Sequence, residues 1–312
     1  MTSNRSLSPV PYSDNLNIGT YNHVAGDQII TTTYNINLTV PSDPTCPPFN
    51  AAPLDFLSGN FMGREQEMRL VIEFLETLHG DVPSRCALHG MHGVGKSQVS
   101  YALAKDLFDR GRYTYIFYIQ ATSIEELYQG FFQLLYRVSH PERYAPEREA
   151  RLLAARCWLE DFTGGTWLLI FDNVAGDRET VKFLRNHLPR KNRHGSILFT
   201  TLTRSIAEAL TDVAGQQRKI VELHVPDVDD AAKLLLKHLG NDPAAIADET
   251  NVRDIVQAVG CLPLAVAQVA EYMAQSCISI TRLAALLKGE HKIKVMCHCY
   301  THCLVHQLAP HS

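Results

Sequence analysis

Residues 90–97 read Gly-Met-His-Gly-Val-Gly-Lys-Ser, and these residue types at this spacing can hold the phosphates of a nucleotide. The glycines allow a tight turn in which successive backbone N–H groups point at phosphate oxygens. The Lys96 ammonium can reach the β- and γ-phosphates, and the Ser97 hydroxyl can complete the shell of a Mg²⁺ ion. A helix that starts here adds its positive end to the same anion.

The flanking residues have the pattern that such a loop requires. Residues 85–89 predict a short buried strand, and Val99, Leu103, Leu107 and Phe108 recur at helical spacing. The order strand, loop and helix is that of a phosphate-binding loop. We therefore predict that the chain binds a nucleoside phosphate rather than presenting a glycine-rich turn that binds nothing.

A second element that such a site needs is an acidic residue at the end of a hydrophobic strand, where it holds Mg²⁺. Residues 167–171 are a fully apolar run of the kind buried on both faces of a parallel sheet, and Asp172 follows at its carboxyl end. The next residue, Asn173, cannot take a proton from an attacking water. Either another residue orients that water, or hydrolysis is slow.

A third element is the stretch 196–204, in which a predicted strand ends in threonines and Arg204. Hydroxyl groups and a permanent positive charge at this place could sense the γ-phosphate. Taken without the other two elements, the same residues fit an ordinary strand with a surface arginine equally well.

The composition is that of a globular protein. The 312 residues are 46% hydrophobic and 20% charged, with a net charge of −4. No basic field therefore favours nucleic acid or an anionic membrane as a partner. The first residues lack the apolar core of a signal peptide, no apolar run approaches membrane-spanning length, and five of the eight cysteines are scattered singly. We expect a cytoplasmic protein with reduced thiols.

The pattern along the chain divides it into four parts. Residues 1–50 form a low-complexity extension that is rich in Ser, Thr, Asn and Pro. Residues 51–218 alternate short apolar runs with amphipathic stretches, which predicts an α/β domain: the parallel sheet of a P-loop NTPase, flanked by helices. Residues 219–290 become helical after an edge strand and predict a small helical domain. Residues 291–312 are rich in cysteine and histidine.

One segment of the extension is ordered in pattern. Between residues 28 and 40, β-branched and aromatic residues alternate with polar ones, and the segment carries no charge and no proline before Val40. One interpretation is a strand that packs on the domain, or a half-ordered tail. The other is a segment that pairs with itself in a cross-β arrangement.

These motifs together resemble a known family. Residues 61–65 (Phe-Met-Gly-Arg-Glu), the loop at 90–97, the strand ending at Asp172, the Thr-Thr-x-Thr-Arg stretch and residues 261–265 (Cys-Leu-Pro-Leu-Ala) follow one another in the order of the NB-ARC domain of STAND ATPases. Proteins with this domain include apoptotic scaffolds, plant resistance proteins and fungal NOD-like receptors. The resemblance covers roughly residues 58–288.

The resemblance implies the ligand and the residues that hold it. Such domains bind ATP or dATP with Mg²⁺, exchange it for ADP and assemble homotypically when activated. No Asn-Lys-x-Asp guanine-reading motif is present, which also favours adenine. Lys96, Asp172 and Arg204 would act on the phosphates, with Ser97 and Asp172 as metal ligands. The nucleotide would be bound by Phe61, Met62, Arg64, Gly90, Met91, His92, Gly93, Val94, Gly95, Lys96, Ser97, Gln98 and Pro263.

Three departures from the family pattern affect this interpretation. His92 replaces a common glycine at a variable position, so binding should survive. Asn173 argues against fast turnover. The sequence also ends before the family's winged-helix domain, its Met-His-Asp motif and its sensor repeats. In the tail, His298, His302 and His306 with nearby cysteines could bind Zn²⁺ on one helix face, but an altered chain end explains the same residues without a metal.

Two classes of function follow. The first is a signalling switch of the STAND type, in which nucleotide exchange and slow hydrolysis control homotypic assembly, as in innate-immunity-like or cell-death signalling. The second is a dedicated enzyme that hydrolyses ATP or transfers its phosphoryl group, although no acceptor site is visible in the sequence. A truncated regulatory form that sequesters full-length relatives is a third possibility.

Overall fold

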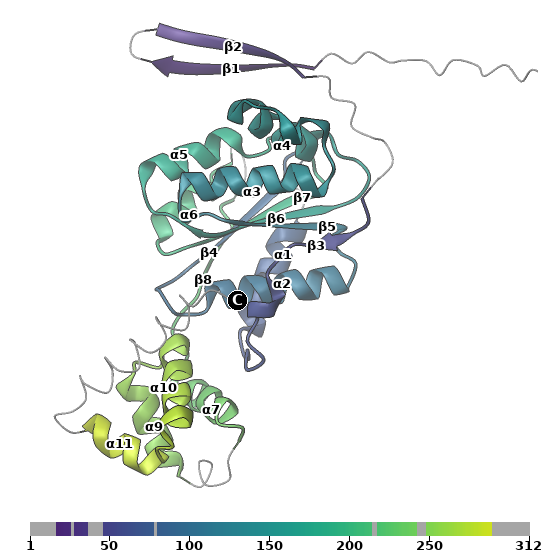
Figure 1. Ribbon diagram of the computed structural model, residues 1–312. Coiled ribbons are helices and arrows are strands. Elements are labelled where there is room, and N and C mark those ends of the chain that lie inside the picture. The colour runs from purple at the N-terminus through teal and green to yellow at the C-terminus, as the bar shows by residue number, and fades with distance from the viewer. Residues whose placement is uncertain are drawn as a thin grey trace, which may run out of the picture.

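The structure is a computed structural model that describes residues 46–77, 80–213, 217–241 and 248–288, together with the backbone of residues 17–25 and 28–36. A six-stranded sheet with the strand order β3-β5-β6-β7-β4-β8 forms the centre of the chain (Figure 1). Every neighbouring pair in this sheet is parallel. The strands are β3 (Phe49–Asn50), β4 (Ser84–His89), β5 (Tyr115–Gln120), β6 (Trp167–Val174), β7 (Gly195–Thr201) and β8 (Ile220–Glu222).

Helices cover both faces of this sheet, which gives it two apolar cores. One core lies under α1 (Glu65–Glu76) and α2 (Lys96–Asp109). The other lies under four helices, namely α3 (Ile124–Arg137), α4 (Arg148–Asp161), α5 (Arg178–His187) and α6 (Arg204–Thr211). Short 3₁₀ turns stand at Leu54–Phe56 and Pro141–Tyr144.

The period of two along β6 decides which core each of its side chains enters. Leu168 and Ile170 belong to the core under α1 and α2, and Leu169 and Phe171 belong to the opposite core. Asp172 continues the first series, so its carboxyl group is on the face that α2 covers. The same alternation that buries the strand therefore turns its terminal acid towards the helix that follows the phosphate loop.

The sequence patterns predicted most of these elements. The strands expected at 85–89, 115–119, 167–171 and 196–201 are present with small changes at their ends. The helix expected after Ser123 is α3, and the Ser123 hydroxyl accepts the Glu126 N–H at 3.2 Å as its N-cap. The predicted fold class, a parallel α/β sheet followed by a helical group, is confirmed.

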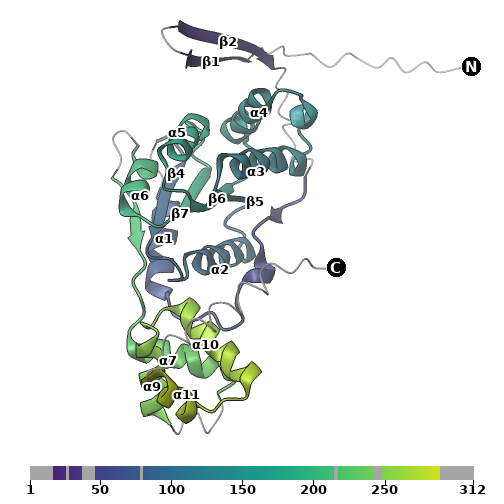
Figure 2. The same ribbon diagram turned by 60° about the vertical axis from the view of Figure 1, so that its left-hand side comes forward.

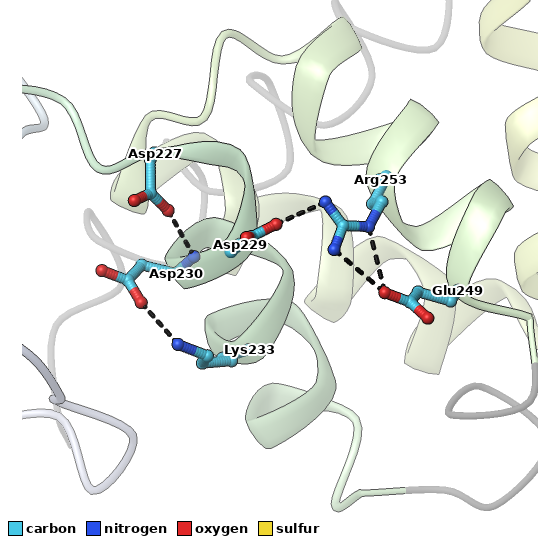
Figure 3. Close-up of polar contacts among 6 residues, drawn as sticks. All are labelled: Asp227, Asp229, Asp230, Lys233, Glu249 and Arg253. Carbon is cyan, nitrogen blue, oxygen red and sulfur yellow. Dashed lines mark hydrogen bonds and ion pairs between the residues drawn. The ribbon is translucent and has the colours of Figure 1, made fainter.

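The helical group has a core of its own, built from α7 (Val228–His238), α9 (Glu249–Ala258), α10 (Pro263–Ser276) and α11 (Ile280–Lys288). Asp227 caps α7 by accepting the Asp230 N–H at 2.8 Å. On its surface, Arg253 of α9 pairs with both Asp229 of α7 and Glu249 (Figure 3). Strand β8 lies inside the range 219–290 expected for the helical part, but it is hydrogen-bonded into the sheet.

The extension contains a β-hairpin, of which the sequence pattern had indicated only the second strand. β1 (Asn17–Ala25) pairs antiparallel with β2 (Gln28–Ile36), with a register from Asn17↔Ile36 to Ala25↔Gln28. Figures 1 and 2 place this hairpin at the opposite end of the molecule from the helical group. Residues 37–40 of the expected segment and the cysteine–histidine tail at 291–312 lie outside the described residues.

Candidate nucleotide-binding site

The loop at 90–95 connects the carboxyl end of β4 directly to the first turn of α2. Gly95 is the N-cap of α2 and has a φ of 102°, and Gly93 has a φ of 77°; side chains other than glycine rarely adopt either value. The backbone N–H groups at the start of α2 lack helical partners and face the loop. This is the geometry of an anion-binding helix terminus.

Lys96 is buried at the start of α2 and points back into this loop. Its ammonium group donates to the carbonyls of Gly90 at 2.9 Å and Met91 at 3.0 Å. Burial lowers the pKa of Lys96, and the nearby Asp172 carboxylate opposes this effect. The loop carbonyls therefore hold the Lys96 ammonium inside the loop, in a position to bind an anionic group.

Asp172 is the centre of a buried network at the end of β6, with only 2% of its surface exposed. Its Oδ2 accepts a hydrogen bond from the Ser97 hydroxyl at 2.8 Å, and its Oδ1 accepts one from Thr200 at 2.6 Å. Three segments distant in sequence, at 97, 172 and 200, thus meet at one carboxylate. A hydroxyl group and a carboxylate side by side are oxygen donors of the kind that Mg²⁺ takes.

Thr200 is a residue of this network that the sequence analysis did not single out. Besides donating to Asp172, its hydroxyl accepts the backbone N–H of Asn173 at 2.7 Å. The run of threonines at the end of the strand 196–201 was the available signal, but it did not tell which hydroxyl faces Asp172. Tyr118 of β5 interacts with the same carboxylate. Burial is the largest cause that raises the pKa of its phenol, and the charge of Asp172 is the next.

Asn173 occupies a special backbone position. Its φ is 59°, in the left-handed region where asparagine and aspartate are the best tolerated residues after glycine. The pairing of β6 with β7 shifts register between Phe171 and Val174, and the Asn173 side chain is exposed. Backbone geometry therefore provides a reason for asparagine here in addition to the chemistry of hydrolysis.

Arg204 is not in contact with this network. It is the first residue of α6, is 67% exposed, and its Nε pairs with Glu208 one turn later at 3.0 Å. The structure brings Lys96, Ser97 and Asp172 together and leaves Arg204 exposed on the surface. Its charge is one of the lesser causes that lower the pKa of His89, at the end of β4, after burial.

The segment before α1 is attached to the loop and to α2. Arg64 donates to the Val94 carbonyl at 3.3 Å and pairs with Glu67 at 2.9 Å. Gln98 accepts the Ser58 N–H and donates to the Phe56 carbonyl, both at 2.8 Å. Gln98 therefore fixes the segment that leads to Phe61 and Met62. Met91 and His92 are exposed at the tip of the loop.

The helical group contacts the loop through the turn that begins α10. The Leu264 N–H donates to the Gly93 carbonyl at 3.2 Å. A Cβ atom on Gly93 would lie 3.1 Å from both Leu262 and Leu264. Pro263, the first residue of α10, stands between these two leucines. The same group also reaches the segment before α1, because Lys237 donates to the Phe61 carbonyl at 3.2 Å.

Comparison with known proteins shows the family of this chain. The family model of the NB-ARC domain matches residues 64–243, more than half of the chain. The chain belongs to the NB-ARC domain family. The match includes the phosphate loop, Asp172, Thr200 and Arg204, and this family is built on a P-loop nucleotide-binding fold.

Two further comparisons place this NB-ARC chain among other proteins. It is 28% identical over 238 residues to a nucleotide-binding leucine-rich repeat (NLR)-like protein of Hyaloscypha variabilis, covering 72% of this chain and 23% of the relative. The chain thus spans about a quarter of that relative's length. The crystal structure of Cdc6p from Pyrobaculum aerophilum superposes with a TM-score of 0.52 at 13% identity, covering 71% of this chain and 64% of that one. This second likeness concerns the fold alone.

In the part of the NB-ARC chain that the structure describes, no helix is both long and apolar enough to cross a membrane. No cluster of three or more histidine, cysteine or acidic side chains that could hold a metal ion occurs there. The cysteine–histidine tail, for which a zinc site was one interpretation, is not part of these residues.

Proposed function

We propose that this protein is an ATP/ADP-dependent signalling switch of the STAND type, in which nucleotide exchange and slow hydrolysis control homotypic assembly. The observation that carries this proposal is the contact of the helical group with the phosphate loop, from Leu264 N–H to the Gly93 carbonyl at 3.2 Å. A loop that holds the nucleotide and a helical group that closes on the same loop are the two parts that a nucleotide-dependent conformational switch needs.

Adenine nucleotide is the proposed ligand. The backbone N–H groups at the start of α2 and the Lys96 ammonium would hold the phosphates, and Phe61, Met62, Arg64 and Pro263 would enclose the base. The hydrogen bonds of Gln98 to residues 56 and 58 support this arrangement, since they fix the segment that carries Phe61 to the helix behind the phosphates.

Mg²⁺ would be held by Ser97 and Asp172. Their oxygens are 2.8 Å apart, and the buried carboxylate keeps its orientation through Thr200. The hydrogen bonds from Ser97 and Thr200 to this buried carboxylate come from hydroxyl groups, and a cation would compensate its charge better than these neutral donors do. When bound, Mg²⁺ would neutralise charge on the phosphate oxygens.

Arg204 is the proposed sensor of the γ-phosphate. Its present partner, Glu208, forms an exposed pair with it within one helix, and such pairs are worth only about 0.3–0.5 kcal/mol. A charge-assisted bond to a phosphate is worth about 1.5–3 kcal/mol. A γ-phosphate within reach of Arg204 would therefore compete successfully with Glu208 for its guanidinium group.

The free energy that a switch requires is within reach of these groups. To shift the protein from a mostly closed to a mostly open conformation, a ligand must bind the open conformation about 5.5 kcal/mol more tightly than the closed one. Two to four charge-assisted contacts to one additional phosphate, at about 1.5–3 kcal/mol each, supply that amount. Lys96, Arg204 and the metal on Ser97 and Asp172 are the groups that could make them.

The hairpin β1–β2 would be the signalling output of the switch or a tether for it. A two-stranded hairpin is marginal on its own, so its strands gain from additional partners. A peptide that spans residues 28–40 should form thioflavin-positive fibres at neutral pH if these strands self-assemble. A peptide that stays soluble and disordered would remove this part of the proposal.

The proposal is tested first by the nucleotide that the protein carries. Mass spectrometry of the intact purified protein should find bound ADP, and the Lys96→Ala variant should lose it and show no heat with ATP or ADP. An unchanged affinity in that variant would defeat the proposal. Sustained ATP turnover above about one per second would favour a dedicated enzyme over a switch.

A further inference from the structure

A group of three arginines lies at the amino ends of the strands. This edge of the sheet is opposite the carboxyl ends, where the phosphate loop begins. Arg85 is the second residue of β4 and Gly90 follows the last, so the two are about 17 Å apart at ~3.3 Å per residue. Arg185 is in the last turn of α5, and Arg190 is in the loop between α5 and β7. The edge they form is therefore separate from the nucleotide site.

Arg85 is the inner member of this group. Its side chain is mostly buried, and its Nη2 donates to the Pro189 carbonyl at 3.2 Å. Its Nε is fully buried and has no hydrogen-bond partner in the part of the chain that the structure describes. A buried guanidinium N–H without an acceptor costs free energy, and an acceptor that entered from outside would recover it.

Arg185 and Arg190 are exposed above it, and no carboxylate is paired with any of the three arginines within the described ranges. Glu160 lies beside Arg190, where its carboxylate accepts the Arg190 backbone N–H at 2.8 Å, and it is 3.9 Å from the Arg156 side chain. Burial lowers the pKa of Arg85 to about 10, and the charges of Arg185 and Arg190 add to the effect. Among the described residues, none of these three guanidinium groups forms an ion pair, although Glu160 lies beside the Arg190 backbone.

The surrounding sequence keeps this edge positive in a chain whose net charge is −4. Residues 182–194 contain five lysines and arginines and no acidic residue. Of these, Lys191 is paired with Asp161 at 2.6 Å. Arg193 is in the same loop as Arg190, and Lys182 lies one turn before Arg185 on α5.

The C-terminus of helix α5 accounts for part of this concentration of positive charge, but not for all of it. Cations are favourable at a helix C-terminus, and Arg185 and the Arg85–Pro189 bond are both placed there. A helix end is equivalent to only about half a negative charge, however, against three guanidinium groups. The excess is what an anion would neutralise.

We propose that Arg85, Arg185 and Arg190 form a second anion site, which takes a small soluble ligand carrying several phosphate groups. Each guanidinium presents paired N–H donors that match phosphate oxygens, and three such groups suit a ligand with more than one negative charge. The site is independent of the nucleotide site and of the function proposed above.

The test uses the full chain saturated with ADP in the absence of magnesium, so that the phosphate loop is filled and the probe is not chelated. Inorganic tripolyphosphate is titrated by calorimetry at 150 mM salt. The Arg185→Ser/Arg190→Ser double variant should weaken its affinity at least tenfold, with ADP affinity unchanged. Both residues are exposed, so this variant should fold.

The matched control is Arg178→Ser/Lys182→Ser, which removes the same charge from exposed positions of α5. It should change the affinity less than threefold. Equal losses in both double variants would mean diffuse attraction to a basic surface, and this would overturn the proposal. The absence of binding to the unmodified chain would also overturn it. So would a lower melting temperature of Arg185→Ser/Arg190→Ser with unchanged affinity, since the arginines would then serve only the end of α5.

Discussion

The Leu264 N–H in the helical group donates to the carbonyl of Gly93 in the phosphate loop across 3.2 Å. The two residues are far apart in sequence, one in the phosphate loop and the other in the first turn of α10, so this bond joins the loop to the helical group directly. If the loop moves when a phosphate binds or leaves, we expect this bond to pass the movement to the first turn of α10.

Gly93→Ala should weaken the contact between the loop and the helical group. The new Cβ would lie 3.1 Å from Leu262 and Leu264, at a φ of 77° that alanine rarely adopts. We expect a loss of about 1–2 kcal/mol in the free energy of unfolding and a weaker affinity for ADP. Urea denaturation and calorimetry measure the two effects. Gly176→Ala is the control, because nothing lies near its Cβ and its φ is not positive; an equal loss there would contradict the argument.

Thr200→Val should uncouple Mg²⁺ from nucleotide binding. The substitution keeps the shape of the side chain but removes its bond to Asp172 at 2.6 Å and its acceptance of the Asn173 N–H at 2.7 Å. A buried group left without its partner costs about 1–3 kcal/mol. We expect that loss in urea denaturation, and a smaller gain in ATP affinity when Mg²⁺ is added. Thr201→Val, which removes one bond of 3.3 Å to Val174, should leave the Mg²⁺ effect intact.

Asn173→Asp should raise ATP turnover. The backbone at this residue has a φ of 59°, which aspartate tolerates, and the side chain is exposed, so the new carboxylate stays hydrated. It would stand next to the proposed metal site as a base for the attacking water. A steady-state hydrolysis assay should show an increase of at least tenfold. Asn173→Gly keeps the backbone but supplies no base, and an equal rise in that variant would refute the role of the carboxylate.

Stability should fall as the pH falls from about 7 to about 5. Burial is the largest cause that lowers the pKa values of His89, His140 and His238 below the ordinary 6.5. The unfolded chain therefore binds these protons at a higher pH than the folded chain, so their contribution is complete above 6.5 and is lost below it.

The melting temperature measured at constant ionic strength should follow this direction. His238 also lies 3.0 Å from the Asn60 amide, between the helical group and the segment before α1. His238→Gln should therefore reduce the slope of melting temperature against pH, while substitution of the exposed His194 by glutamine should not. A melting temperature that is constant or rises between pH 7 and pH 5 would contradict this prediction.

The sequence alone indicated the elements whose causes are local. The glycines and Lys96 at 90–97, between a short apolar strand and a helical repeat, predicted the loop, because strand, turn and helix each depend on neighbouring residues. The apolar run at 167–171 predicted a buried parallel strand, and its length placed Asp172 at the carboxyl end. Membership in the NB-ARC family followed from five such motifs in order.

Only the tertiary structure decided which distant residues meet. The strand order β3-β5-β6-β7-β4-β8 brings Thr200 beside Asp172, and no periodicity encodes which strands are neighbours. The positive φ of Asn173 and the contact of Leu264 with Gly93 likewise depend on packing between segments. Local residue types determine what a segment can become, whereas the register and packing of the whole sheet determine which chemical groups it will face.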